Sequence, residues 1–205
     1  MVGNCISDDD ICCKAANDEI IRRYYSALDQ MADGEDNESE VGKIALLLKQ
    51  ARITTEYRRV TVAAKQRETT AGNPSAAIEL SDGTILSAET SDLLGPCAAL
   101  LLKATKHLAG IDHSVKLIPG RLIEPIQKTK VTYLHGKNPR LHTDEVLIAL
   151  SVLSPDDENC RKALDTLPLL KGCQVHSTVL LSDIDKKVFK KLGVDLTCEP
   201  VHERH

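Results

Sequence analysis

The spacing of the apolar residues changes at Gly72-Asn73-Pro74, and this change constrains the fold more than any other feature. Before this segment, apolar residues recur at intervals of three and four, which is typical of helices with one buried face. After it, short apolar runs alternate with turn residues and further helical patterns. The sequence therefore predicts a helical region over residues 1–72, a mixed α/β domain over residues 73–200, and a tail without fixed structure over residues 201–205.

The helical region contains two clear helices joined by an acidic turn. The first helix should begin at Ser7 and end near Gly34, because serine caps helices and the three aspartates after it suit the positive end of the helix dipole. Residues 56–68 carry a weaker helical pattern, so the region is either a helical hairpin or a three-helix segment. The apolar faces are formed by Ile21, Tyr24, Tyr25 and Leu28 in the first helix and by Val41, Ile44, Ala45 and Leu48 in the second.

The mixed domain should begin with a β-hairpin, since Asp82-Gly83 suits a type I′ turn between residues 76–80 and 84–87. A hairpin joins antiparallel strands, so the sheet should be mixed rather than purely parallel, and the fold class is α/β with an α+β tendency. Pro125 permits at most the first turn of a helix within residues 123–130. Further strands are expected at residues 115–118, 131–134, 174–181 and 194–198. Further helices are expected at residues 96–110 and between Ser182 and Gly193, and two more should begin at a Thr143 cap and at Pro155.

The composition argues against several classes of function. Aromatic residues make up only 2% of the chain and the formal net charge is −4, so there is little to stack on bases and no overall attraction to a phosphate backbone. No apolar run approaches the roughly 20 residues that cross a bilayer, and neither a signal-peptide pattern nor a glycine-rich phosphate-loop motif occurs. We therefore expect no nucleic-acid partner, no membrane association and no cofactor in this chain.

The seven cysteines and seven histidines lack the spacing of a metal site. Structural zinc is held by ligand pairs at short spacing, whereas Cys12 and Cys13 are adjacent, and Cys173 and His176 would face opposite sides of a strand. We expect no metal. An odd number of cysteines without an export signal indicates reduced thiols and a cytoplasmic protein. Cys97 opens an apolar helical run, so we expect it in the core rather than as a nucleophile.

The densest polar segment, residues 135–145, is a basic loop that runs into a predicted helix amino terminus. Backbone N–H groups at such a terminus bind phosphate or carboxylate, although Asp144 and Glu145 compete for the same positive end. A solvent-exposed loop and a half-exposed strand would give the same patterns without function, so both interpretations stay open. No catalytic residue is identified, and the candidate ligand-binding residues are Asn138, Arg140, His142, Thr143, His176 and Thr178.

Several long stretches carry a family resemblance, among them EIIRRYY, NPRLHTDEVLIALS, GCQVHSTVLLS and VFKKLGVDLTCEP. They resemble the carboxy-terminal part of the bacterial family catalogued as domain of unknown function family 1846. Members of that family are much longer, and their amino-terminal part carries a Gly-Ser-Gly-Lys segment similar to a nucleotide phosphate loop. The resemblance implies that residues 1–6 connect to a preceding segment, that the chain is part of a larger protein, and that a nucleotide would bind in the other part.

Three functions are compatible with these observations. The first is a cytoplasmic module of a larger bacterial protein that packs against the amino-terminal part and completes a shared ligand site or assembly interface. The second is a self-contained enzyme that acts on a small phosphorylated or carboxylate metabolite. The third is a structural domain whose amino-terminal helices form a homo-oligomer. For the first function, the predicted contributors to the shared site are Arg140, His142, Thr143 and His176.

Overall fold

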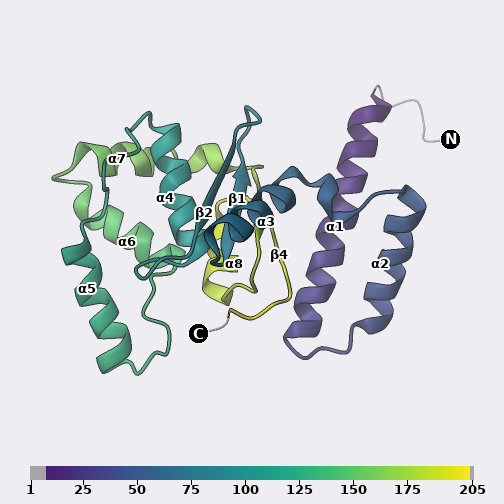
Figure 1. Ribbon diagram of the computed structural model, residues 1–205. Coiled ribbons are helices and arrows are strands. Elements are labelled where there is room, and N and C mark those ends of the chain that lie inside the picture. The colour runs from purple at the N-terminus through teal and green to yellow at the C-terminus, as the bar shows by residue number, and fades with distance from the viewer. Residues whose placement is uncertain (1–7, 204–205) are drawn as a thin grey trace.

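A mixed four-stranded sheet lies at the centre of the structure, a computed structural model that describes residues 8–203 (Figure 1). The strands β1 (Ser75–Glu79), β2 (Ile85–Glu89), β3 (Gln174–Ser177) and β4 (Asp195–Cys198) are arranged in the order β2-β1-β3-β4. β1 is antiparallel to both β2 and β3, whereas β3 and β4 are parallel. The predicted α/β class with a mixed sheet is confirmed.

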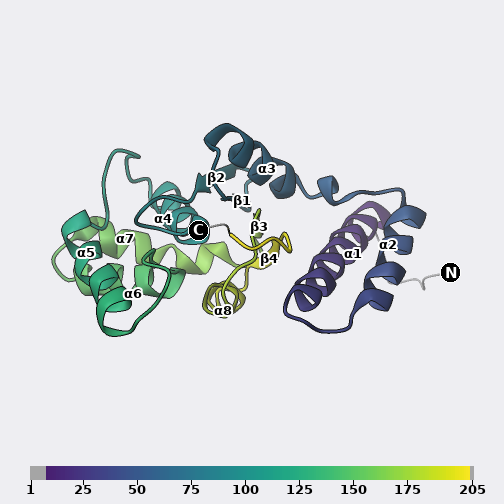
Figure 2. The same ribbon diagram turned by 60° about the horizontal axis from the view of Figure 1, so that its bottom comes forward.

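Helices cover both faces of the sheet, because alternate residues of β1 point to opposite sides. Ala77 packs against Val60 and Ala64 of α3 (Arg59–Ala71). Ala76 and Ile78 face the other side, where α4 (Pro96–Leu108) and α8 (Asp183–Lys191) pack. Figure 2 shows α3 on one side of the strands and α4 and α8 on the other.

A second apolar cluster lies beyond α4 and is built mainly by helices. It includes side chains of α5 (Gly120–Lys128), α6 (Thr143–Leu153) and α7 (Glu158–Asp165). Short 3-10 helices cover Thr55–Tyr57 and Leu167–Leu170, and Thr129–Tyr133 forms a π-helical turn after α5. This cluster places the amino end of α6 beside α8, where the candidate site is found.

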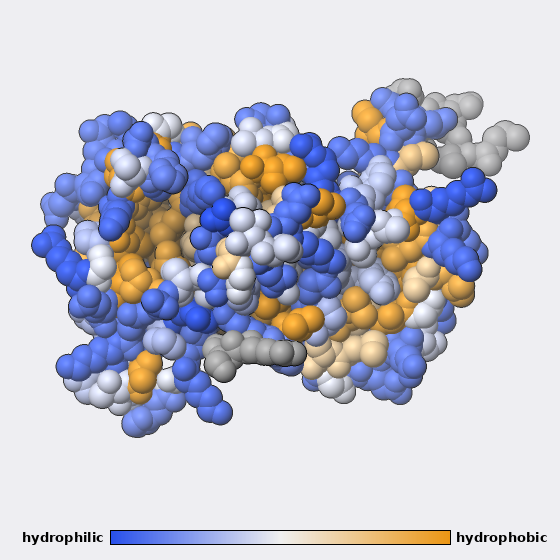
Figure 3. Space-filling model, viewed as in Figure 1, coloured by the Kyte–Doolittle hydropathy of each residue, from blue (hydrophilic) through white to orange (hydrophobic). Residues whose placement is uncertain are grey.

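The amino-terminal helices form the predicted hairpin. α1 (Asp9–Ala32) and α2 (Glu38–Ala51) pack side by side at the opposite end of the molecule from α4–α7, as Figures 1 and 2 both show. α1 also contacts β4, whereas the main packing partner of α2 among residues 8–203 is α1. Figure 3 shows hydrophobic residues on the surface of this helical pair. Leu46 and Leu47 of α2 are 60% and 47% exposed, so residues 8–203 leave one side of the hairpin largely uncovered.

Several helix boundaries differ from prediction. Asp8, whose side chain accepts a hydrogen bond from the Ile11 N–H, caps α1, while Ser7 and residues 1–6 lie outside the described residues. His142 rather than Thr143 is the N-cap of α6. Pro155 lies in a turn, and Asp157 caps α7 by accepting bonds from two backbone N–H groups. In each case a polar side chain with extended backbone ends up at the cap.

Two predicted strands are absent from the described part of the chain. In residues 115–118, Leu117 and Ile118 are buried in the helical cluster instead of a sheet, and residues 131–134 fall largely in the π-helical turn. The prediction for Pro125 was also wrong, since it lies inside α5. The proline costs the helix one backbone hydrogen bond, and the burial of Ile123 against the cluster opposes that cost. The strand predicted at residues 174–181 is β3, which ends at Ser177.

The carboxy-terminal segment is held in place as far as it is described, contrary to the expectation of a tail without fixed structure. The Leu180 N–H donates to the Val201 carbonyl at 2.8 Å, and Glu203 forms an ion pair with Arg140 at 2.7 Å. Residues 204–205 lie outside the described residues. Among residues 8–203, no helix combines the length and apolar character needed to span a membrane.

Phe189, the single phenylalanine of the sequence, is 1% exposed in the core between α8 and the sheet. We expect Phe189→Ala to lower the free energy of unfolding by about 3–5 kcal/mol, because it leaves a cavity in a packed core. Urea denaturation followed by circular dichroism measures the change. Ile184→Ala on the same helix is the matched control, since Ile184 is 44% exposed. Equal losses for the two variants would contradict the described packing of α8.

Candidate functional site

A cavity of about 400 Å³ opens at the carboxyl ends of the parallel strands β3 and β4. Its walls come from residues 179–182 after β3, from His202 and Glu203 after β4, from Gly95 and Pro96 at the start of α4, and from the loop before α6. In open α/β sheets, ligands bind outside the carboxyl ends of the strands, because the connecting loops leave a crevice there. We call this cavity the strand-end pocket.

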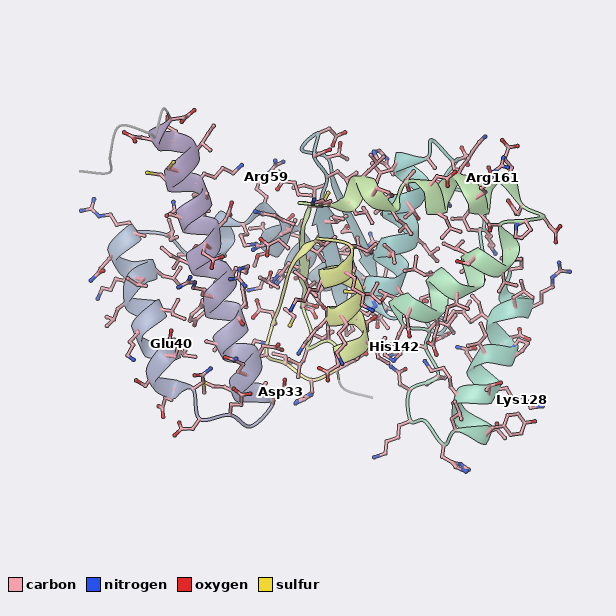
Figure 4. The ribbon with its side chains drawn as sticks, turned by 180° about the vertical axis from the view of Figure 1, so that it is seen from behind. Asp33, Glu40, Arg59, Lys128, His142 and Arg161 are labelled. Carbon is pink, nitrogen blue, oxygen red and sulfur yellow. The ribbon has the colours of Figure 1, made fainter. Side chains whose placement is uncertain are left out.

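Asp185, in the first turn of α8, organises the wall of the strand-end pocket. Its Oδ1 accepts hydrogen bonds from the Thr143 N–H at 2.9 Å and from the Thr143 hydroxyl at 2.8 Å. Its Oδ2 accepts one from the Ser182 hydroxyl at 2.8 Å and lies 2.9 Å from His142 Nδ1. This buried carboxylate therefore joins the amino ends of α6 and α8 and orients the His142 ring. Figure 4 shows His142 near α6 and α8.

The two members of this pair shift each other's protonation. The hydrogen bond to Asp185, aided by its negative charge, raises the pKa of His142 above the usual range although partial burial opposes the shift. Burial by itself would raise the pKa of Asp185, but the hydrogen bonds from His142 and the Thr143 N–H outweigh it and lower the pKa. The pair is thus a carboxylate that stays ionised beside a histidine that binds a proton readily.

The geometry leaves one ring nitrogen of His142 available to a ligand. Nδ1 must carry a proton to bond the carboxylate, so Nε2 is the atom that gains or loses the second proton. Nε2 makes no hydrogen bond to the described residues, and His142 lines the pocket. Ser182 is not placed as a nucleophile, because its hydroxyl donates to Asp185 and lies on the Nδ1 side, 3.4 Å from that nitrogen.

Asn138 lines the same pocket, and Arg140 lies beside it, but both side chains are engaged with the protein. The Asn138 side chain accepts from the Arg140 N–H at 3.0 Å and so closes the turn before α6. The Arg140 guanidinium donates to the Ser91 carbonyl at 2.9 Å and to the Glu203 carboxylate at 2.7 Å. Arg140 therefore holds the carboxy-terminal segment against the pocket, and its charge is already paired.

The amino end of α6 is occupied by side chains of the protein itself. The His142 N–H donates to Glu145 at 2.8 Å, and the Thr143 N–H donates to Asp185. Thr143 is completely buried and serves this contact. The expected anion site on the α6 backbone is thus filled. By contrast, no side chain caps α4, whose N-cap Gly95 borders the same pocket.

His176 and Thr178 do not join this group. His176 is completely buried on the α1 side of the sheet, with Nδ1 3.0 Å from the Thr197 hydroxyl and its ring against Tyr25. Burial lowers the pKa of His176. Thr178 accepts from the Ser75 N–H and donates to Glu68 of α3. Of the six candidate residues, Asn138 and His142 line the strand-end pocket. Arg140 and Thr143 lie behind its wall, bonded to Glu203 and Asp185, and His176 and Thr178 lie elsewhere.

The cluster around His176 attaches α1 to the sheet. Glu199 accepts hydrogen bonds from the Tyr25 hydroxyl at 2.9 Å and pairs with Lys65 at 2.7 Å, and His176 Nε2 lies 3.5 Å from it. Burial would raise the pKa of Glu199, but these three partners lower it to about 2. Burial raises the pKa of Tyr25, which keeps its donor proton. The cluster is a buried structural contact in which His176 Nε2 makes no hydrogen bond to the described residues.

The cysteines give no reactive site in the described residues. The prediction for Cys97 is confirmed, since it is 1% exposed and burial raises its pKa well above the usual range. Cys12 and Cys13 are exposed on the first turns of α1. Within residues 8–203, no three His, Cys, Asp or Glu side chains converge so as to hold a metal ion.

Sequence reasoning missed Asp185 as a site residue. Ser182 and Asp185 were recognisable only as a helix start, and Ser182 does cap α8. The second role of Asp185, as the partner of His142, joins positions 43 residues apart. No local pattern encodes such a pair, because it depends on where α6 and α8 come to lie.

Two protein-family profiles match the chain. The profile described as "Domain of unknown function DUF1846, C-terminal" matches residues 56–205. The chain belongs to this family. The profile "Domain of unknown function DUF1846, N-terminal" matches residues 1–52, which include α1 and α2. The resemblance inferred from the sequence is thereby confirmed, and the helical hairpin belongs to the other domain of the family.

The relatives are longer proteins whose names state no activity. UPF0371 protein cu0538 of Corynebacterium urealyticum is 48% identical over 204 residues, which cover 100% of the chain and 41% of that protein. UPF0371 protein SpyM50764 of Streptococcus pyogenes is 42% identical over 205 residues, which cover 100% of the chain and 42% of that protein. The chain therefore spans about two fifths of the length of the curated relatives it matches.

The His142–Asp185 pair makes a titration prediction. We expect the pKa of His142, measured from its ring protons by NMR, to lie above about 6.5 in the wild type and to be lower in Asp185→Asn, which removes the charge that raises it. Because the folded-state pKa is raised, the stabilisation is complete below about pH 6.5 and is lost as the pH rises through the folded-state value. His142→Gln should therefore lower the free energy of unfolding by about 1 kcal/mol more at low pH than at high pH.

The control for this titration is Asp183→Asn, which changes an exposed carboxylate in the same turn of α8. It should leave the titration of His142 unchanged. If Asp185→Asn and the wild type titrate alike, the pair described above does not form in solution.

Proposed function

We propose that the chain supplies one wall of a ligand site in a longer bacterial protein, and that the ligand is a small phosphorylated or carboxylate metabolite. The observation that carries the proposal is the Asp185–His142 pair in the strand-end pocket. A buried carboxylate that orients a histidine toward a cavity is the arrangement used for general acid–base catalysis. His142 would donate a proton to the ligand from Nε2, or accept one there.

The charges at the pocket favour an anion as the ligand. Asp185 is paired with His142, and Glu203 is paired with Arg140, so the charges cancel pair by pair when His142 is protonated. What remains is the uncapped amino end of α4, which carries the positive end of a helix dipole. An anionic group placed between this end and protonated His142 would meet two favourable partners.

The remainder of the longer protein would complete the site. Residues 1–52 match the amino-terminal domain of the family, and α2 leaves Leu46 and Leu47 exposed. Large exposed apolar side chains that lie together mark surfaces for association. We propose that this side of α2 packs against the rest of the amino-terminal domain, and that any nucleotide cofactor binds there, since the present chain contains no phosphate-loop motif.

We also place the protein in the cytoplasm. The six cysteines among the described residues are all free thiols, two of them exposed on α1. Exposed free thiols are typical of proteins in a reducing compartment.

The ligand site can be tested by thermal denaturation in the presence of inorganic phosphate, glycerol phosphate and citrate. A ligand at ten times its Kd stabilises by about 1.4 kcal/mol, which raises the Tm of a chain of this size by about 3–6 °C. We expect such a rise for the wild type with at least one of these anions, and its loss in His142→Ala. His135→Asn, which changes an exposed histidine that does not line the pocket, is the matched control and should keep the rise.

If none of the anions stabilises the chain, the experiment is repeated with a full-length relative, because the proposed site has a second wall. Absence of stabilisation in both proteins contradicts the anion site. Stabilisation that survives in His142→Ala contradicts the role of His142.

The proposed packing of α2 predicts an association. When the chain is co-expressed with the remaining part of the 48% identical Corynebacterium urealyticum relative, the two should co-purify. Changing both Leu46 and Leu47 to Glu should abolish the complex, because it places charges in an apolar interface. Lys49→Gln with Gln50→Glu, also on α2, changes the net charge by the same amount and should have little effect.

Light scattering separates this packing from the third function considered above. A chain that forms a stable dimer, and loses it on the Leu46 and Leu47 changes, would show that a second copy covers α2 instead. A monomer that never binds the remaining part would contradict both.

A further inference from the structure

A second cavity, of about 660 Å³, lies between α4, β2 and the loop of residues 109–119. Leu86, Ala99, Leu102, Ile111 and Val115 line it and are only partly buried, so their apolar surface faces open space. Figure 3 shows a hollow with hydrophobic residues in its floor in the half of the molecule that contains α4 and α5. We call it the apolar pocket, and its size is within the range of small-molecule sites, roughly 300–1,000 Å³.

The mouth of the apolar pocket is cationic. Lys103, Lys106 and Lys116 border it together with His107 and His113, and no Asp or Glu is among the described residues that line it. The chain as a whole has a formal net charge of −4, so a pocket bordered only by basic groups is not a consequence of composition. Apolar walls with a cationic mouth match the two parts of an anionic amphiphile.

The three lysines are not equally engaged with the protein. Lys106 donates to the carbonyls of His113 and Val115, at 2.6 and 2.5 Å, and thereby holds the loop that forms one wall. Lys103 donates to the Ser87 carbonyl of the edge strand β2 at 2.7 Å. Burial lowers the pKa of both groups. Lys116 is exposed and makes no hydrogen bond or ion pair with another described residue, so it is available to a ligand.

Two acidic residues lie near the pocket in the sequence, and only one of them forms an ion pair. Asp112 accepts hydrogen bonds from the backbone and hydroxyl of Ser114, and Glu89 pairs with Arg67 at 2.6 Å. Asp112 keeps its negative charge, which acts on Lys106 and His113. Lys116 has no ion-pair partner among the described residues and is therefore the cation most available to a ligand. The pocket also lies within the segment matched to the carboxy-terminal domain, at the end of the molecule away from α1 and α2 (Figure 1).

We propose that the apolar pocket binds the acyl chain of a medium-chain carboxylate, with the carboxylate at the mouth beside Lys103 and Lys116. The acyl chain would contact Leu86, Leu102 and Ile111, and the ammonium groups would select the charged head. This site is separate from the strand-end pocket, since no described residue lines both cavities.

Fluorescence displacement tests the proposal. The probe is dansyl-undecanoate, whose emission rises in apolar surroundings, and its competitors are octanoate, decanoate and decanol below their micelle concentrations. We expect one probe per chain, an affinity for the carboxylates that rises by up to about fourfold per added methylene, and weaker competition by decanol. Added salt should weaken the carboxylates but not decanol.

Three variants locate the site. Lys116→Gln should lower the affinity for decanoate by about two- to fivefold without changing that for decanol. Ala99→Leu, which fills part of the cavity, should shorten the longest acyl chain that binds. Lys187→Gln, an exposed lysine of α8 outside the pocket, is the matched control. If Ala99→Leu fails to fold by circular dichroism, the lysine variant and the chain-length series still decide the matter.

Several results would overturn the proposal. One is that the probe emission does not rise, and another is that more than one probe binds per chain. The others are that decanol and decanoate compete equally, or that Lys116→Gln leaves the affinity for decanoate unchanged. A chain that dimerises through this face and excludes the probe would show that a second copy occupies the pocket. None of these outcomes bears on the His142 site, because that site is tested with small hydrophilic anions.

Discussion

The pairing of β1 with β3 is the constraint on which the other contacts depend. Ala76 pairs with Ser177 and Glu79 with Gln174, so the chain between them is closed into one long loop that contains α4–α7. Closing such a loop costs conformational entropy. Burial offsets that cost, because Val175, His176 and Ser177 of β3 are completely buried. Once β3 is in place, the chain that follows it enters α8 and then β4 beside it.

The strand-end pocket is a consequence of this topology. β3 and β4 are parallel, so their carboxyl ends lie at the same edge and α8 crosses between them. The long loop returns α6 to that edge, and the Asp185 carboxylate satisfies the exposed donors of the amino end of α6. A buried carboxylate without such partners would be costly. The contact that stabilises the helix junction is therefore also the contact that orients His142.

The two histidines considered from the sequence show how position decides chemistry. His142 lies at a cavity beside a carboxylate that lacks another cationic partner, and its pKa is raised. His176 also has a carboxylate nearby, but Glu199 is already bonded to Tyr25 and Lys65, and burial lowers the pKa of His176. The same residue type thus has a raised pKa in one place and a lowered pKa in the other.

The α/β class, the amino-terminal hairpin, the β1–β2 hairpin and the burial of Cys97 follow from the sequence, because periodicity, Asp82-Gly83 and an apolar run act locally. The predicted type I′ turn was wrong, since only Gly83 of the pair has a positive φ and the turn is closed by the Gly83 N–H and the Leu80 carbonyl. The polar loop before α6 was recognisable for the same reason. Which polar residues meet was decided only by the tertiary structure. Asp185 bonds to His142, Arg140 pairs with Glu203, and the His176 ring packs against Tyr25 of α1. Long-range strand pairing brings these side chains together, and no local pattern relates them.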